Sequence, residues 1–242
     1  MVSVQQLLPF ARGRKPRRRG GRLGRVTRPE RAGFVPHAAR PNHEARHPVH
    51  VTMKRVPAAP SLRAQRVLEA IVEELRAASK RGVGVLHYSV QVDHLHLIVE
   101  APDTAKLARQ LQQLFSRIAF AVNRVSRRGG RLFRDRHHRH ELTTPTEVRR
   151  ALVYVLFNER KHGATSASAI ERHLAWLDVG SSAVWFEDWA PRARPPPDVV
   201  ARLRARIGAP PVRPPQTWLA RVGFRRAGGP IRFDESPAAP RR

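Results

Sequence analysis

The stretch YSVQVDHLHLIV, from Tyr88 to Val99, decides the fold because apolar and polar residues alternate along it. Alternation of this kind is typical of β-strands, and this stretch is either one strand or the two arms of a hairpin. Side chains two residues apart share one face of a strand. His94 and His96 are therefore predicted to lie side by side on one face of a sheet. The residues predicted to enter a core on the other face are Leu95, Leu97 and Val99.

Periodic segments flank this hairpin on both sides. Strands are predicted at 47–56, 82–91, 94–100 and 131–142, and helices at 61–80 and 104–125. The resulting order, β-α-β-β-α-β, is that of the ferredoxin-like split unit, an α+β fold with an antiparallel sheet and helices on one face. We expect His94 and His96 to lie on the open face of that sheet.

Composition divides the chain into three zones. Residues 1–45 form an Arg-rich tail that we expect to be disordered, residues 46–164 form the folded domain, and residues 165–242 form a Trp- and Pro-rich extension that we expect to be partly disordered. The aromatic residues of the extension either pack against the domain or stack on the bases of a bound strand. These residues are Trp176, Trp185, Phe186 and Trp189.

A helix is predicted over 144–163, with the sequence TPTEVRRALVYVLFNERKHG. Thr144, Pro145 and Glu147 form a capping box with proline at the first helical position. One face is apolar and consists of Val148, Ala151, Leu152, Val155 and Leu156. A second face groups Arg150, Tyr154, Asn158 and Lys161. The phenol on that face is either a packing residue or a reactive group, and the helix alone leaves both open.

The chain is strongly basic. It has 46 Lys+Arg against 19 Asp+Glu, a formal net charge of +27 and no cysteine. This imbalance predicts a polyanionic partner, and nucleic acid is favoured over a membrane because no long apolar span is visible. Without cysteine there is neither a disulfide nor a thiolate metal site, which fits a cytoplasmic, nucleoid-associated protein of bacterial type.

The tail has a motif of its own. Arg12, Gly13, Arg14 and Lys15 resemble the core of an AT-hook with one inserted residue, which would place arginines in a narrow minor groove. The alternative is a generic cationic tail that binds any phosphate backbone. In either case Arg12, Arg14 and Lys15 are predicted to contact nucleic acid.

Three segments in one order carry a family resemblance. DHLHLIVEAP, GGRLFRDRHHRH and YVLFNERKHG resemble the single-tyrosine HUH transposases of the insertion-sequence 200/605 type, closest to their REP-associated branch, over about residues 47–163. The resemblance implies that His94 and His96 bind a divalent metal, that Tyr154 is the nucleophile and that Asn158 completes the metal shell. Two positions depart from the family pattern, because Glu159 stands where proline often follows and Phe133 replaces a tryptophan.

The implied activity is cleavage and rejoining of single-stranded or hairpin DNA through a 5′-phosphotyrosine, with Mg²⁺ or Mn²⁺ as cofactor. Family members act as homodimers or as monomers. Besides the tail, the residues predicted to bind nucleic acid are Arg150, Lys161, Arg131, Arg134 and Arg136. The proton acceptor for the tyrosine is left open among His87, His137, His138 and His140.

Other functions remain open on the sequence alone. A nickase or replication initiator would use the same chemistry. A domesticated nucleic-acid-binding protein that no longer cuts is a different class, and it gains support if Tyr154 is buried or if His94, His96 and Asn158 do not converge. A His-dependent RNA phosphodiesterase would need no tyrosine.

Overall fold

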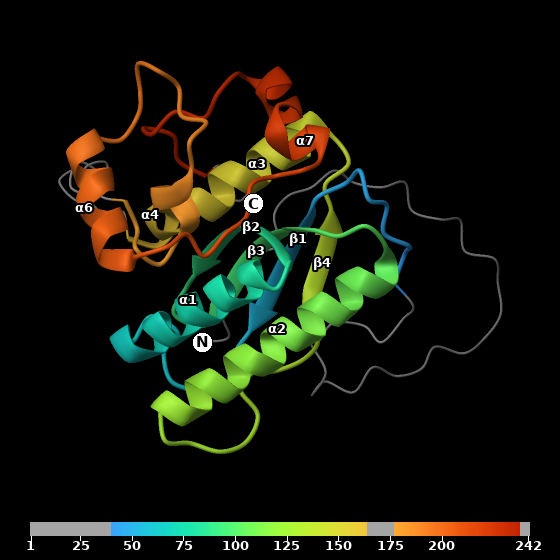
Figure 1. Cartoon of the computed structure of the whole chain (residues 1–242), viewed down its shortest axis with the longest axis vertical. Coiled ribbons are helices and arrows are strands. Elements are labelled where there is room, and N and C mark those ends of the chain that lie inside the picture. The colour runs from blue at the N-terminus through green and yellow to red at the C-terminus, as the bar shows by residue number, and fades with distance from the viewer. Residues whose placement is uncertain (1–39, 164–176, 238–242) are drawn as a thin grey trace.

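The computed structural model describes residues 40–163 and 177–237, around a four-stranded antiparallel sheet in the order β2-β3-β1-β4. The strands are β1 (Val49–Lys54), β2 (Gly84–Val90), β3 (His94–Glu100) and β4 (His138–Glu141). Helices α1 (Gln65–Lys80) and α2 (Thr104–Val125) lie side by side over one face of the sheet (Figure 1). This order of elements confirms the predicted α+β, ferredoxin-like fold.

The first core fills the space between the sheet and the two helices. Leu95 and Leu97 of β3 are completely buried in it, and Val99 is 2% exposed. Burying an aliphatic side chain of this size contributes roughly 1.5–3 kcal/mol. The alternation in the hairpin therefore selects the face of β3 that meets α1 and α2, and it leaves His94 and His96 on the opposite face.

Local capping signals fix where two helices begin. The side chain of Asp103 accepts a hydrogen bond of 2.7 Å from the Lys106 backbone N–H at the start of α2. At the start of α3 (Pro145–Leu156), Thr144 and Glu147 form the predicted capping box. Caps of this kind contribute about 1 kcal/mol each because they satisfy backbone donors that the helix leaves unpaired.

A second core covers the other face of the sheet. It joins α3 to η2 (Ser182–Trp185), α7 (Trp218–Arg221) and η3 (Gly223–Ala227), and α6 (Pro197–Ile207) lies at its margin. Aromatic rings of the extension hold it together, with ring centroids 4.7 Å apart for Phe186 and Trp189 and 5.8 Å apart for Trp189 and Phe233. The prediction of an open sheet face is therefore correct only in part, because α3 and the extension cover β2 and β3, whereas the residues of β4 are half-buried.

The predicted helix over 144–163 is in fact two helices. Phe157 leaves helical geometry at φ −120° and ψ 20°, and α4 (Asn158–Gly163) begins directly after it. The Phe157 ring packs with Trp189 and Phe233 at centroid distances of 5.7 and 6.3 Å. The Arg160 guanidinium lies 4.1 Å from the centre of the Phe157 ring. We attribute the break to this packing.

The predicted strand over 131–142 is also shorter than expected. Phe133 makes only an isolated bridge to Arg55, and regular pairing begins at His138. Between them the side chain of Asp135 accepts a hydrogen bond of 2.8 Å from the Arg136 backbone N–H, which favours a turn.

Some of the predicted residues lie outside the described part of the chain. They are Arg12, Arg14, Lys15 and Trp176, and the side chain of Lys161 is likewise not described. Among the helices of 40–163 and 177–237, none has the length and apolar character needed to span a bilayer.

Candidate active site

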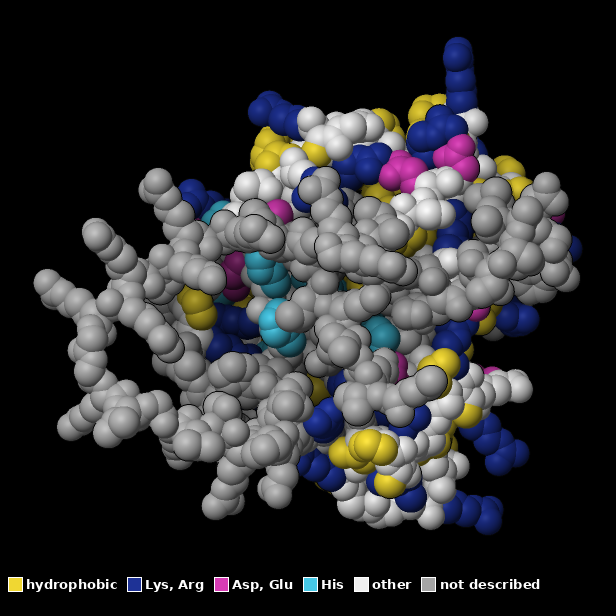
Figure 2. All heavy atoms as spheres, turned by 180° about the vertical axis from the view of Figure 1, so that it is seen from behind, with side chains coloured by type: hydrophobic (Ala, Val, Ile, Leu, Met, Phe, Trp, Pro, Cys, Tyr) yellow, Lys and Arg dark blue, Asp and Glu magenta, His cyan; other side chains and the backbone are white. Residues whose placement is uncertain are grey.

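Histidines gather on the sheet face opposite α1 and α2 (Figure 2). The register explains how, because Thr52 of β1 is paired with His96 of β3 on one side and with His138 of β4 on the other. His50 is paired with His140 in the same way. Directly opposed residues of antiparallel strands share a face. Strand alternation thus brings imidazoles from three strands onto one surface.

His94 and His96 are neighbours on this surface. Their ring centroids are 4.5 Å apart and the ring planes meet at 84°. His94 Nδ1 lies 2.6 Å from a carboxylate oxygen of Asp93, whose other oxygen lies 3.2 Å from Lys54 Nζ. The hydrogen bond with His94, aided by the positive charge of Lys54, holds the pKa of Asp93 well below its usual range. Asp93 is therefore ionised and fixes the orientation of the His94 ring.

His96 is oriented by β1. Its Nδ1 lies 3.0 Å from the Thr52 hydroxyl and 3.2 Å from His50 Nε2, and the His50 and His96 rings stack at 5.2 Å. Burial lowers the pKa of His50 to about 3, so its imidazole is neutral at pH 7. Sequence reasoning missed His50. The alternation of β1 in the sequence could have identified it, because it puts His50 and Thr52 on the sheet face away from α1 and α2.

Helix α3 brings Tyr154 onto the histidines. The phenol ring meets His96 edge-on at a centroid distance of 5.0 Å and His50 at 6.1 Å. Tyr154 is 5% exposed, and burial raises the pKa of its hydroxyl above the usual 10. The side chain of Asn158 acts in the opposite direction on that pKa. The phenol is therefore protonated at neutral pH.

Asn158 reaches the site through the helix break. It is the first residue of α4 and is completely buried. In the described part of the chain its side chain lies within hydrogen-bonding reach of the Tyr154 hydroxyl, and neither amide atom has another partner. The prediction that Arg150, Tyr154 and Asn158 share one helix face was wrong. Asn158 belongs to α4 and is buried, as Tyr154 is, whereas Arg150 is exposed.

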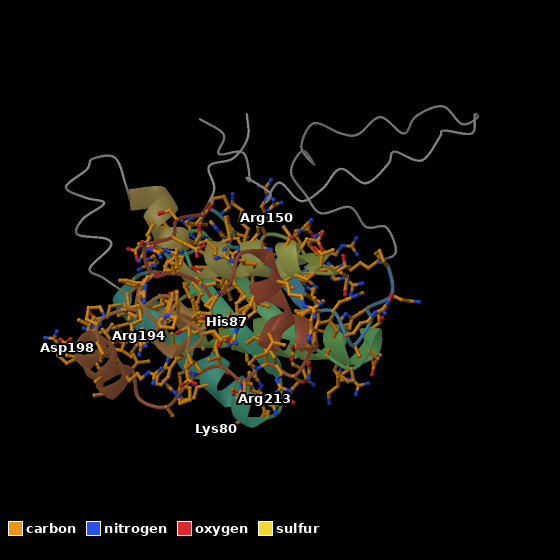
Figure 3. The ribbon with its side chains drawn as sticks, turned by 90° about the horizontal axis from the view of Figure 1, so that it is seen from above. Lys80, His87, Arg150, Arg194, Asp198 and Arg213 are labelled. Atoms are coloured by element: carbon orange, nitrogen blue, oxygen red, sulfur yellow. The ribbon has the colours of Figure 1, made fainter. Side chains whose placement is uncertain are left out.

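The predicted phosphate-binding cations are distributed differently. Arg150 projects from α3 on the side of the molecule opposite Lys80 of α1 (Figure 3). Arg131 is exposed, whereas Arg134 and Arg136 are half-buried in the segment before β4. The structure thus places Arg150 one helical turn before Tyr154 and the other three arginines at the β4 side of the sheet.

The four histidines proposed as proton acceptors fall into two groups. His138 and His140 lie on β4, and the ring of His140 is 3.6 Å from the Glu147 carboxylate. His87 lies against Ser182 and Phe186, and burial lowers its pKa to about 4. His137 packs against Phe115 of α2, on the other side of the sheet. His87, paired with Ile98, and His138 and His140 therefore share the sheet face of His96, and His137 does not.

The side chains around His94 and His96 can be tested as ligands of a divalent ion. Among the described residues no group of three His, Cys, Asp or Glu side chains is placed to hold a metal, so a site here has to include another donor. The amide of Asn158, buried without a regular hydrogen bond, is such a donor. Because Nδ1 of both His94 and His96 is engaged, Nε2 is the atom left to coordinate an ion on each ring. The residues present fit an ion held by two imidazoles and one amide oxygen.

Comparison with known proteins finds a likeness among solved structures. No protein-family model matches the chain, and no curated protein matches it. A solved structure described as a REP-associated tyrosine transposase bound to a REP hairpin resembles it over 61% of this chain and 82% of that chain, with 15% sequence identity and a TM-score of 0.44. The fold assigned above rests on the strand order and register of this chain itself.

Proposed function

We propose that this protein is a metal-dependent DNA strand transferase whose nucleophile is Tyr154. The observation that carries the proposal is the contact between the rings of Tyr154 and His96, whose centroids are 5.0 Å apart. His94 lies beside His96 on the same face of β3. A phenol beside two oriented imidazoles combines a nucleophile with groups that can bind a metal ion.

In this reaction the Tyr154 hydroxyl oxygen attacks the scissile phosphorus of a DNA strand. The bond from phosphorus to the 3′ oxygen breaks, the tyrosine retains the 5′ phosphate, and the 3′ oxygen leaves with a proton as a hydroxyl. Attack by that 3′ hydroxyl, or by another one, reverses the step and rejoins the strand. One phosphodiester replaces another, so no nucleotide cofactor is consumed.

Removal of the phenolic proton is the demanding part of this step. Burial raises the pKa of Tyr154, so the proton has to leave as the bond to phosphorus forms. His50 and His96 are the imidazoles whose rings lie within 6.1 Å of the phenol ring. His96 is assigned to the metal, and burial lowers the pKa of His50 to about 3, so neither ring is proposed as the final acceptor of the proton.

His94, His96 and Asn158 would hold the ion, Mg²⁺ or Mn²⁺, through two Nε2 atoms and an amide oxygen. When bound, the ion would neutralise charge on the scissile phosphate. Asp93 and Thr52 would keep the two imidazoles in position, as the partners of metal-binding histidines commonly do. Arg150, exposed one turn before Tyr154, would contact the incoming strand, with Arg131, Arg134 and Arg136 further along it.

A second candidate is a nucleic-acid-binding protein that no longer cuts. The observation that favours it is burial, because Tyr154 is 5% exposed and Asn158 is completely buried. A phosphate can reach the phenol only if the segments that cover it move. A nickase or replication initiator would share the tyrosine chemistry and would differ from a transferase only in its target.

The deciding experiment compares the wild type with Tyr154→Phe. Each protein is incubated with 5′- or 3′-labelled single-stranded and hairpin DNA libraries and Mn²⁺, and a denaturing gel is scanned for DNA linked to protein. We expect an adduct with the strand on the 3′ side of the cut, absent in Tyr154→Phe and in the presence of a chelator. Tyr154→Phe keeps the buried ring, so circular dichroism should show an unchanged fold.

The two candidates predict different outcomes. A tyrosine-dependent adduct supports the transferase. Tight binding of DNA by both proteins without any adduct, across the whole library, supports the non-cutting protein. An adduct that forms equally in Tyr154→Phe would show that another residue is the nucleophile.

A further inference from the structure

A groove lies on the outer surface of the layer formed by α1 and α2. This layer is on the other side of the sheet from α3, the helix of Tyr154, as the ribbons of Figures 1 and 3 show. The volume of the groove is about 970 Å³. Its basic lining residues are Arg81, Arg109, Arg117 and Arg124. The remaining lining includes Gln112, Gln113, Ser116, Phe120 and a single acid, Glu74. The groove is therefore separate from the site of the proposed transfer reaction.

The charge of the groove is not balanced by neighbouring groups. Its four arginines are all exposed, and in the described part of the chain none of them forms an ion pair. Elsewhere on the surface arginines do pair, as Arg202 does with Asp198 at 3.0 Å and Arg225 with Asp188. Four arginines against one glutamate make the groove a site for an anion with several charges.

The spacing along α2 suits an extended polyanion. Arg109, Arg117 and Arg124 lie on one stripe of the helix, and a rise of 1.5 Å per residue separates them by roughly 12 and 10 Å. An extended phosphate backbone can place a phosphate at each of these positions. A small anion, by contrast, would reach only one or two of the guanidinium groups.

Phe120 indicates which kind of polyanion the groove binds. Its side chain lies on the same stripe, between Arg117 and Arg124, and the residue is 77% exposed. An aromatic ring surrounded by arginines is a platform on which an unpaired base stacks, whereas a duplex keeps its base faces covered. Gln112, Gln113 and Ser116 add hydrogen-bonding groups beside it.

We propose that this groove binds single-stranded nucleic acid, with phosphates on the arginines and one base on Phe120. This inference goes beyond the proposed strand transfer, because it assigns a second binding surface on the opposite layer of the molecule. Such a surface would hold a strand whether or not Tyr154 cuts it.

The first test reverses charge in the groove of the full chain. Arg117→Glu combined with Arg124→Glu is compared with Arg192→Glu combined with Arg206→Glu, which changes the net charge equally at exposed positions outside the groove. All variants carry Tyr154→Phe, so adduct formation does not enter. Binding of a fluorescent oligothymidylate is measured by anisotropy over a range of salt concentrations. We expect the groove pair to weaken binding at least tenfold more than the control pair and to reduce the salt slope by about 1.4.

The second test concerns the stacked base. We expect Phe120→Leu to weaken oligothymidylate binding at least fivefold and Phe120→Tyr to restore it, because leucine keeps the apolar volume but not the aromatic face. Photocrosslinking with a strand that contains 5-iodouracil should label the peptide with Phe120. The residue is exposed, so these variants should fold normally, and circular dichroism checks this.

Three results would overturn the inference. The groove pair and the control pair could bind equally. A duplex could bind as tightly as the single strand with no effect of Phe120→Leu, which would indicate backbone recognition only. Polyglutamate could compete as well as the oligonucleotide at equal charge, which would indicate an acidic protein partner. None of these depends on whether the wild type forms a tyrosine adduct, so the two proposals fail separately.

Discussion

Tyr154 on α3 meets His96 on β3 edge-on, with ring centroids 5.0 Å apart. The contact forms because α3 packs against the sheet face that carries His50 and His96. This packing limits the proposed reaction, because a buried phenol is poorly accessible to a phosphate. Any strand transfer at this site therefore requires the phenol to become exposed to the DNA strand.

Asn158→Leu should stabilise the fold and damage the site. Among the described residues the Tyr154 hydroxyl is the one indicated partner of this buried amide, so its remaining hydrogen-bonding capacity is unmet. An unmet buried polar group costs roughly 1–3 kcal/mol, and leucine has a similar volume. We expect the free energy of unfolding to rise by about 1 kcal/mol, while Mn²⁺ affinity falls at least tenfold. Urea unfolding and calorimetric titration with Mn²⁺ measure the two effects.

Asn123→Leu is the matched control for that change, because Asn123 hydrogen-bonds through its amide to Gly130 and Arg128. The control should lose stability and keep metal affinity. A loss of stability in Asn158→Leu would show instead that the amide is held by partners that matter for folding.

His94→Ala and His96→Ala should each reduce Mn²⁺ affinity by at least tenfold. Each removes one of the two imidazoles whose Nδ1 is already oriented by a neighbour. His138→Ala, on the same sheet face, should retain most of the affinity. Titration of the apoprotein with Mn²⁺, followed by electron paramagnetic resonance, measures binding directly. Equal loss in all three variants would place the ion elsewhere on the histidine face.

Glu159→Gln should stabilise the protein at alkaline pH. Burial and the negative charge of Asp178 raise the pKa of Glu159 to about 7, while Arg63 opposes the shift. The folded state thus retains a proton between pH 4.5 and 7 that the unfolded state has lost, so stability falls as pH rises through this window. Glutamine removes this loss. Urea unfolding at pH 5 and pH 8 should show the gain only at pH 8.

Glu187→Gln provides the comparison for Glu159, because the Glu187 side chain is 83% exposed. Its stability should differ little from the wild type at either pH. If Glu159→Gln behaves in the same way, Glu159 does not share a proton with Asp178 in the folded protein.

His87 should make the fold sensitive to acid. Burial lowers its pKa to about 4 from an ordinary 6.5, so the unfolded state binds a proton that the folded state excludes between these values. Stability is therefore lost as pH falls from 6.5 to 4, with a slope of up to about 1.4 kcal/mol per pH unit from this residue. His87→Gln should flatten the decline in that window, and urea unfolding between pH 7 and 4.5 measures it. His47→Gln, at a half-buried surface position, is the control.

The sequence alone determined the sheet and the side of it on which the site lies. Alternation from Tyr88 to Val99 assigns Leu95 and Leu97 to the core, and so places His94 and His96 on the opposite face. The capping box at Thr144 set the start of α3. Both signals are local, since strand faces and helix caps depend on residues a few positions apart.

Only the tertiary structure decided how the site is completed and covered. Phe157 ends α3 by packing with Trp189 and Phe233, which are distant in the chain, and this changes how Asn158 approaches Tyr154. His50 joins His96 because β1 pairs with β3. The core that contains Tyr154 also takes in side chains of the C-terminal extension. Such contacts are set by the packing of apolar surface between segments far apart in sequence, and that packing overrides the local preference for one continuous helix.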